Sequence, residues 1–175
     1  YALKQYTVTF DLGIASLESG ELSQNISHGS GAQAPAIIVP VSHTFTGWSA
    51  DFSNITGELA VKAQFAIKNY NVSFDLGVGN RIGGGTLNQS VNHGASAVAP
   101  DIAVPEAYQF TGWSANFSNI TGNLTVEAQY ALKVYSVNFD LGAGSRTSGG
   151  SLSQNVSHGS SAQAPNVVAP EGEYF

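Results

Sequence analysis

Three histidines and three aspartates recur at equivalent places in a repeated pattern, and these side chains have the most obvious potential for chemistry. The histidines each precede a glycine and lie 65 residues apart: His28, His93 and His158. The aspartates each follow a phenylalanine: Asp11, Asp75 and Asp140. Imidazole and carboxylate groups bind metal ions or exchange protons when the fold brings several of them together.

The spacing of these residues argues against a metal or acid-base site. Each histidine and each aspartate belongs to a different copy of the pattern, and no further His or acidic ligand accompanies it at metal spacing. The D-x-D or D-x-N-x-D run of a calcium loop is also missing. We therefore expect the histidines at turns or strand ends, and the aspartates as caps that accept hydrogen bonds from nearby backbone N–H groups.

Other signatures of active sites are missing from the sequence as well. It contains no cysteine and no Gly-x-Ser-x-Gly elbow, and the Gly-Gly-Gly-Thr at 83–86 lacks the lysine that follows in a phosphate-binding loop. His43 occupies the position of Tyr108 in the next copy, and we interpret it as a local packing variant. The sequence thus predicts no catalytic, cofactor-binding or metal-binding residues, no cofactor and no enzyme activity.

Two tryptophans, Trp48 and Trp113, have two interpretations. They belong either to an exposed aromatic platform for sugars or peptides, or to the hydrophobic core. A unit of about 65 residues without disulfides has little apolar area to bury, and a tryptophan supplies much of it. We therefore expect both tryptophans to anchor the cores of their copies.

Half of the six basic residues recur where one copy meets the next: Lys4, Lys68 and Lys133. Lysines at such places discourage unwanted pairing between strand edges. The alternative is a covalent isopeptide bond from Lys to Asn or Asp, which the intact mass would reveal as a loss of ammonia or water. We favour the first interpretation.

The composition excludes two classes of partner. Of the 175 residues only 10% are charged, the formal net charge is −6, and the basic residues form no cluster that would bind nucleic acid or anionic lipid. No apolar run approaches the roughly 20 residues that span a bilayer. We therefore predict no nucleic-acid partner and no membrane insertion in this segment, and a surface solvated mainly by hydroxyl and amide groups.

The whole chain is built from a repeat of about 65 residues. The copies begin with YTVTFDLG at residue 6, YNVSFDLG at residue 70 and YSVNFDLG at residue 135. Their spacings differ by one residue, and the difference falls in a Gly- and Ser-rich loop, where insertions are tolerated. We predict four segments: the tail of a preceding repeat (1–5), repeat 1 (6–69), repeat 2 (70–134) and an incomplete repeat 3 (135–175).

Apolar residues within each copy alternate with a period of two, which is typical of half-buried antiparallel strands. In the segments 70–76 and 124–132 they occupy the even-numbered positions, whereas from Tyr135 onward they occupy the odd ones. A single strand with such a slip would turn inside out. We therefore predict a kink or repeat boundary at Lys133–Val134.

Between the first and closing strands of repeat 2 we expect a Gly-rich loop at 77–85 and short strands around 87–93 and 110–113. The Ala/Pro segment between these strands contains two prolines five residues apart, which disfavour both a helix interior and a central strand. A single helical turn is the longest helix that we expect there. The predicted fold class is mainly β with little or no helix.

These anchors, in this order, resemble a known family. Tyr-x-Val-x-Phe-Asp-x-Gly, then His-Gly, two prolines, Phe-Thr-Gly-Trp and Leu-x-Val-x-Ala-Gln-Tyr/Phe resemble the Listeria–Bacteroides repeat, also known as the internalin B-type B repeat. The resemblance covers nearly every residue, twice in full and once in part. It implies tandem β-grasp-like (ubiquitin-like) repeats of secreted or surface-anchored bacterial proteins, with adhesin or spacer roles and no catalytic residues.

From these features we predict a non-catalytic structural segment of a bacterial cell-surface or extracellular protein, acting as a stiff adhesin stalk or a fibre-forming array. Its expected partners are neighbouring repeats, other copies of the chain in fibres, and a host or matrix protein or glycan. The alternative is a glycan- or protein-binding accessory module of a larger secreted protein or enzyme. That module would use positions that differ between copies, 14–21 against 78–85 and 36–44 against 101–109.

The third copy stops at EGEYF (171–175), before the Thr-Gly-Trp and the closing strand of the pattern. A 41-residue piece of this kind, 135–175, buries too little apolar surface to be stable by itself. We therefore expect chain outside this segment, or a neighbouring molecule, to complete it, and we expect the segment to belong to a longer array.

Overall fold

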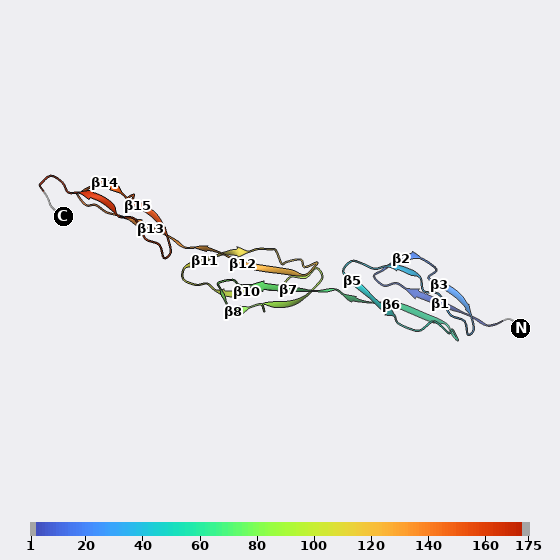
Figure 1. Cartoon of the computed structure of the whole chain (residues 1–175). Helices are drawn as coiled ribbons and strands as arrows, with labels where there is room; N and C mark the ends of the chain where they lie inside the picture. Colours follow the sequence, from blue (N-terminus) through green and yellow to red (C-terminus); the bar gives the residue numbers. More distant parts are fainter. Residues whose placement is uncertain (1–2, 173–175) are drawn as a thin grey trace. The chain divides into compact units, whose positions relative to one another are not determined.

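A computed structural model describes residues 3–172, and Figure 1 shows their arrangement along the chain. These residues form sixteen β-strands and no helix. The chain is therefore all-β, as its alternating pattern predicts. Residues 1–2 of the expected preceding repeat and 173–175 of the expected third copy lie outside the described residues.

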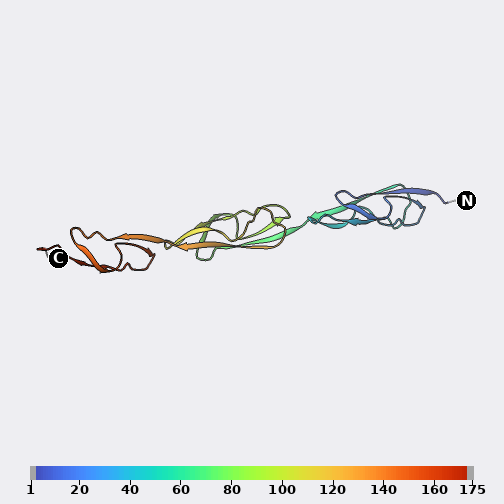
Figure 2. The same ribbon diagram turned by 90° about the horizontal axis from the view of Figure 1, so that it is seen from above.

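The first repeat is built on a four-stranded sheet in the order β3-β1-β6-β5. Its strands are β1 (Gln5–Asp11), β3 (Ser23–Ser27), β5 (His43–Trp48) and β6 (Leu59–Ile67). Strand β1 pairs antiparallel with β3 and parallel with β6, and β5 pairs antiparallel with β6. The first and last strands of the repeat thus lie side by side at the centre of the sheet, as both views show (Figure 1 and Figure 2).

The alternating apolar residues of β1 and β6 form the core of the first repeat. Val8 and Val61 are fully buried, and Phe10 and Ile55 are 5% and 2% exposed. The positions between them along the strands are exposed, so the period of two in the sequence corresponds to one buried and one solvated side of the strands.

A two-stranded sheet of β2 (Ser16–Ser19) and β4 (Ala36–Ile38) accompanies the four-stranded sheet of the first repeat. Its register shifts by one residue between Leu17 and Ser19. All four residues of β2 are exposed, which explains why the sequence shows no alternation there. A strand with both sides in solvent has no hydrophobic signature.

The second repeat uses the same order, with a four-stranded sheet β11-β12-β7-β9 and a two-stranded sheet β10-β8. These strands are β7 (Asn69–Asp75), β8 (Asn80–Gly84), β9 (Asn88–Asn92), β10 (Pro100–Ala103), β11 (Tyr108–Trp113) and β12 (Leu124–Leu132). The predicted strands in the regions of 70–76, 87–93, 110–113 and 124–132 are therefore confirmed.

Two parts of the expected pattern are wrong. The Gly-rich segment 77–85, expected to be a loop, contains β8, because its backbone pairs with β10 in spite of having few side chains to pack. The Ala/Pro segment, where one helical turn was the compatible helix, contains β10 instead, and Pro100 is its first residue. A proline is tolerated at the first position of a strand, and a register shift between Asp101 and Ile102 accommodates the pairing.

The third segment forms two separate two-stranded sheets, β13-β15 and β14-β16. Its strands are β13 (Val134–Asn138), β14 (Ser145–Gly149), β15 (Ser153–Ser157) and β16 (Pro165–Val168). Tyr135 is 47% exposed and Val134 57%. The expectation that other chain completes this segment stays a prediction.

The chain divides into two compact units whose boundary runs through the second repeat. The first unit contains the whole of the first repeat and the segments 89–97 and 117–124 of the second. The second unit contains the remainder of the second repeat and the third segment. The start of the second repeat, up to Val72, thus belongs to the same compact unit as the first repeat, and this unit includes the junction residue Lys68.

Candidate functional site

The junction between the first two repeats consists of a single residue. Strand β6 ends at Ile67, β7 begins at Asn69, and Lys68 alone separates them. The Lys68 N–H donates a hydrogen bond to the Ser42 carbonyl of the first repeat (2.9 Å), and the Lys68 carbonyl accepts one from the His93 N–H of the second (2.8 Å). One peptide segment is therefore bonded to both repeats.

The next junction has the same construction. Lys133 lies between β12 and β13, its N–H donates to the Ala107 carbonyl (2.8 Å), and its carbonyl accepts from the His158 N–H (2.8 Å). Before the first repeat, the Lys4 carbonyl accepts from His28 N–H at 2.8 Å. The recurring lysines and histidines thus meet through backbone groups, at each junction in turn.

The histidine rings pack on the tyrosines that open each repeat. The ring centroids are 5.9 Å apart for Tyr6 and His28, and the planes are tilted by 50°. The equivalent pairs are Tyr70 with His93 at 5.9 Å and Tyr135 with His158 at 6.0 Å. The predicted position of the histidines at turns is confirmed, because each lies in the turn that follows a strand.

A lysine ammonium group also contacts the first of these ring pairs. The Lys4 ammonium lies 5.1 Å from the centroid of the Tyr6 ring, a cation–π distance. At the Lys68 junction, the His93 Nδ1 is buried without a hydrogen-bond partner. In the described part of the chain, no three His, Asp or Glu side chains are grouped to hold a metal ion.

The recurring aspartates cap the turns that follow the first strand of each repeat, as predicted. Asp11 Oδ1 accepts a hydrogen bond from the Gly13 N–H at 3.0 Å. The same bond joins Asp75 to Gly77 and Asp140 to Gly142, each at 2.9 Å. The three glycines have φ of 57°, 52° and 55°, in the left-handed region where glycine is favoured. The carboxylates therefore fix the turn geometry.

The tryptophans pack against the cores of their repeats. Trp48 meets Phe10 edge-on, with ring centroids 5.1 Å apart and an interplanar angle of 73°, and Phe45 at 5.5 Å. Trp113 meets Phe74 at 5.1 Å with the same 73° angle. The expected packing of both tryptophans against the core is therefore confirmed. Both indoles are half-buried, so they cover the edge of the core and are not fully enclosed by it.

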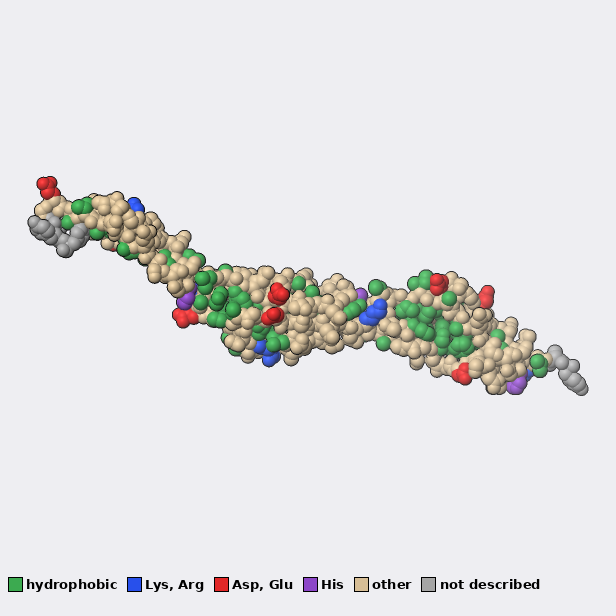
Figure 3. Space-filling view, in the orientation of Figure 1, with side chains coloured by type: hydrophobic (Ala, Val, Ile, Leu, Met, Phe, Trp, Pro, Cys, Tyr) green, Lys and Arg blue, Asp and Glu red, His purple; other side chains and the backbone are tan. Residues whose placement is uncertain are grey.

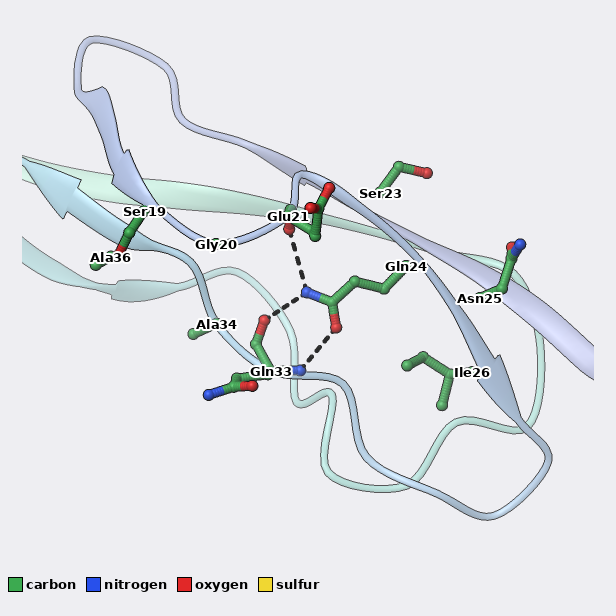
Figure 4. Close-up of a pocket in the computed structure, with 10 residues that line it drawn as sticks. All are labelled: Ser19, Gly20, Glu21, Ser23, Gln24, Asn25, Ile26, Gln33, Ala34 and Ala36. Atoms are coloured by element: carbon green, nitrogen blue, oxygen red, sulfur yellow. Dashed lines mark hydrogen bonds between the residues drawn. The ribbon is translucent and has the colours of Figure 1, made fainter.

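A glutamine without an expected role, Gln24, connects β3 to the loop segments on either side of it. The Gln24 Oε1 accepts from the Gln33 N–H (2.9 Å), and its Nε2 donates to the carbonyls of Gln33 (2.6 Å) and Glu21 (3.1 Å), as Figure 4 shows. The amide thus bonds to the backbone of both flanking loop segments. Gln154 makes the equivalent three bonds in the third segment. The sequence signal was its recurrence at the same repeat position.

Gln24 lies in a pocket of about 630 Å³ that β3 and the ends of β2 and β4 line. Figure 4 shows its lining side chains, among which Glu21 is the sole charged one. The polar atoms of the Gln24 amide are already bonded to backbone groups. This amide is therefore already occupied and is not available to a ligand in the pocket.

An arginine closes the first loop, where the copies differ, in the second repeat and in the third segment but not in the first repeat. In the second repeat the Arg81 guanidinium donates to the carbonyls of Gly85 (2.7 Å) and Gly84 (2.9 Å). Arg146 closes the third segment in the same way. The equivalent position in the first repeat is Leu17, which is 41% exposed, and its loop is one residue shorter. The arginine therefore accompanies the inserted glycine and satisfies its carbonyl.

Two curated bacterial proteins show what the chain is similar to. One from Evansella cellulosilytica, provisionally named a Gly-rich membrane protein, is 25% identical over 126 residues, which are 61% of this chain and 14% of that protein. Another from the same organism, provisionally named a membrane protein, is 24% identical over 160 residues, or 80% and 23% of the two lengths. This chain thus spans less than a quarter of either relative.

No solved structure matches the chain significantly. Among the described residues, there is no helix with the length and hydrophobicity needed to cross a membrane. The sequence profile of the Listeria-Bacteroides repeat domain matches residues 6–69 and 70–133, which make up most of the chain. The two matches end next to Lys68 and at Lys133, the junction lysines. The chain therefore belongs to the Listeria-Bacteroides repeat domain family, with two tandem copies.

Proposed function

We propose that this chain is a non-catalytic structural segment of a bacterial cell-surface or extracellular protein, in which tandem repeats form a stiff stalk that presents or spaces other domains. The observation that carries the proposal is the junction at Lys68, one residue long and hydrogen-bonded to both repeats. A flexible linker would permit many interdomain angles, whereas a bonded junction of one residue restricts them. The bacterial membrane proteins that share the pattern support the location.

The arrangement of the sheet supports a β-grasp-like relationship for each repeat. Its first and last strands are parallel neighbours at the centre of a mixed four-stranded sheet. In chain order, β4 lies between the β1–β3 pair and the β5–β6 pair, which is where a β-grasp fold carries its helix. A stalk requires repetition, stability and a solvated surface, and it does not require an active site or a ligand-binding pocket.

Stiffness at the junction is testable by distance measurements between the repeats. The chain contains no cysteine, so spin labels attach uniquely to cysteines introduced at the exposed positions Val41 (74% exposed) and Ile82 (71% exposed). We expect a narrow distance distribution from pulsed electron resonance. Insertion of a Gly-Ser linker after Lys68 should broaden it, while the same linker appended to the C-terminus should not. A distribution that is already broad in the parent chain would refute the stalk.

A second candidate function, recognition of a protein or glycan partner, is favoured by one observation. Apolar side chains on and near the β2–β4 ribbon are exposed: Ile38 is 56% exposed, Ile14 50% and Leu17 41%. Figure 3 shows hydrophobic side chains gathered over the first repeat. The three positions lie in the stretches that differ between copies. A glycan array or a pull-down from matrix extracts, compared with an Ile38→Ser variant, tests it: loss of a bound partner in the variant supports recognition.

A further inference from the structure

The position of β1 and β6 determines how tension would enter the first repeat. Covalent tension reaches this repeat at the start of β1 and leaves it at the end of β6, because these are its first and last strands. The two strands are parallel neighbours, with Val8 opposite Leu59 and Asp11 opposite Lys62. Pulling on the chain therefore slides β1 and β6 along each other in opposite directions. All the hydrogen bonds between them are loaded at once, instead of opening one after another.

The sheet order leaves β1 and β6 as the principal load path. Strand β5 has β6 as its sole neighbour in the sheet order β3-β1-β6-β5, so the β5–β6 hairpin follows β6 as a unit. The load on β6 then passes to the remainder of the repeat through β1. Beneath this pair lie the fully buried Val8 and Val61 and the nearly buried Phe10, so sliding would also disrupt the packed core.

Side chains extend the paired region at both of its ends. At the start of β1, the Thr7 N–H donates a hydrogen bond of 2.8 Å to the Glu58 carboxylate oxygen Oε2, just before β6 begins. At the other end, the Lys62 Nζ lies 3.9 Å from Asp11 Oδ2. The first bond is in line with the backbone ladder, so it adds one more bond that sliding must break.

The second repeat contains equivalent side-chain links. The Asn71 N–H donates to Asn123 Oδ1 at 2.9 Å, in the place of the Thr7–Glu58 bond. The Ser73 Oγ and the Thr125 Oγ1 lie 3.1 Å apart, within hydrogen-bond distance. A different acceptor, amide in place of carboxylate, thus supplies the same bond. The hydrogen bond is present in both repeats, although its acceptor is charged in the first and neutral in the second. The common feature of this position is therefore the hydrogen bond and not the charge.

We propose that the parallel β1–β6 pair, with its Glu58 bond, is a mechanical clamp through which the first repeat resists tension, so that the chain is a load-bearing tether as well as a spacer. Strands β7 and β12 are the corresponding neighbours in the second repeat. This inference rests on the proposed stalk function for its biological setting. Its physical content, resistance that depends on the direction of pulling, belongs to the single repeat.

Single-molecule force spectroscopy on the full chain tests the clamp. Pulling from the two ends of the chain slides β1 along β6. Pulling from cysteines introduced at Ile14 and Lys62, which lie near the same end of the pair, separates the strands one bond at a time. We expect a clearly higher unfolding force from the chain ends. Because a repeat has about 64 residues at about 3.3–3.6 Å each, its full extension reaches about 210–230 Å, which identifies the events.

Two matched variants separate the clamp from ordinary stability. Glu58→Ala removes the acceptor of the Thr7 N–H on the β1 side of β6. Ser49→Ala removes the acceptor of the Lys62 N–H, also at 2.8 Å, on the β5 side. In end-to-end pulling we expect Glu58→Ala to lower the unfolding force of one repeat and Ser49→Ala to leave it unchanged, while urea denaturation shows similar small losses for both.

The outcomes are distinct. Equal forces in the two pulling directions, or equal effects of the two variants on the force, would overturn the clamp. A direction-dependent force together with a broad spin-label distribution would support the clamp and refute the stiff stalk. A narrow distribution with no dependence on direction would retain the stalk and refute the clamp.

Discussion

Phe10 is the side chain whose truncation tests the account of the core most directly. It is 5% exposed, and it meets two other aromatic rings edge-on: Trp48 at 5.1 Å and Phe52 at 5.3 Å. Phe10→Ala removes the ring on which both of the others rest. The neighbouring Val8 and Val61 are held by paired backbone and cannot move far to fill the space, so a cavity remains.

The expected loss is large compared with the stability of the repeat. Truncation of a buried phenylalanine to alanine costs about 3–5 kcal/mol of unfolding free energy. At about 0.05–0.15 kcal/mol per residue, a repeat of about 64 residues has about 3–10 kcal/mol in total. With a urea m-value of about 1 kcal/mol per molar for a unit of this size, the midpoint should fall by about 3 M or more. Phe10→Ala should therefore leave the first repeat close to unfolding at 25 °C.

Tryptophan fluorescence can report this change for the first repeat alone. The chain has two tryptophans, so Trp113→Phe leaves Trp48 as the single reporter, and urea titrations with and without Phe10→Ala are compared in this background. The matched control is Val41→Ala, at a side chain that is 74% exposed, and its effect should stay within about 0.5 kcal/mol. If Phe10→Ala changed the unfolding free energy by less than about 1 kcal/mol, the aromatic core described above would be wrong.

Three further predictions concern the polar groups of the repeats. Gln24→Ala should destabilise the first repeat by about 0.5–1.5 kcal/mol, because it removes the side-chain hydrogen bonds to the exposed Gln33 backbone, and urea denaturation measures this loss. Hydrogen bonds from Ser53 lower the pKa of Asp51. The stabilising effect of its carboxylate should therefore be present above the unfolded-state pKa and disappear as the pH falls through the folded-state pKa. In urea denaturation measured at a series of acidic pH values, Asp51→Asn should remove this part of the pH dependence of the unfolding free energy. Arg81→Leu should increase amide hydrogen exchange in the Gly-rich loop by leaving two carbonyls unbonded, with little change in global unfolding.

The sequence predicted the strands that have one buried side. In β12 the even-numbered residues are the more buried ones, and Val126 is fully buried, so the alternation translates directly into burial. The change of parity near Lys133 was also visible, because apolar residues alternate with a period of two along the sequence on both sides of it. These features follow from local patterns of hydrophobicity, which a single sequence contains.

The strands of the two-stranded sheets could not be predicted in this way. The five residues of β14 are all exposed, and β8 contains glycines, so neither strand shows alternation. Their pairing is determined by the turn before them and by partners far along the chain. The role of Gln24 has the same origin, since its partner Gln33 is nine residues away across a turn and neither residue type specifies such a bond. Recurrence in each copy was the available signal.

The junction shows why a short connection suffices between these repeats. The strand that closes one repeat continues into the strand that opens the next, so the chain leaves and enters at central strands and requires no excursion across a surface. The change of buried side must then occur within one residue, and the two hydrogen bonds of Lys68 hold the backbone in that conformation. A linker of several residues would also allow the buried side of the strand to change, but it would lack those two hydrogen bonds and would permit many angles between the repeats. The proposed stalk and the proposed clamp therefore both depend on this one-residue junction.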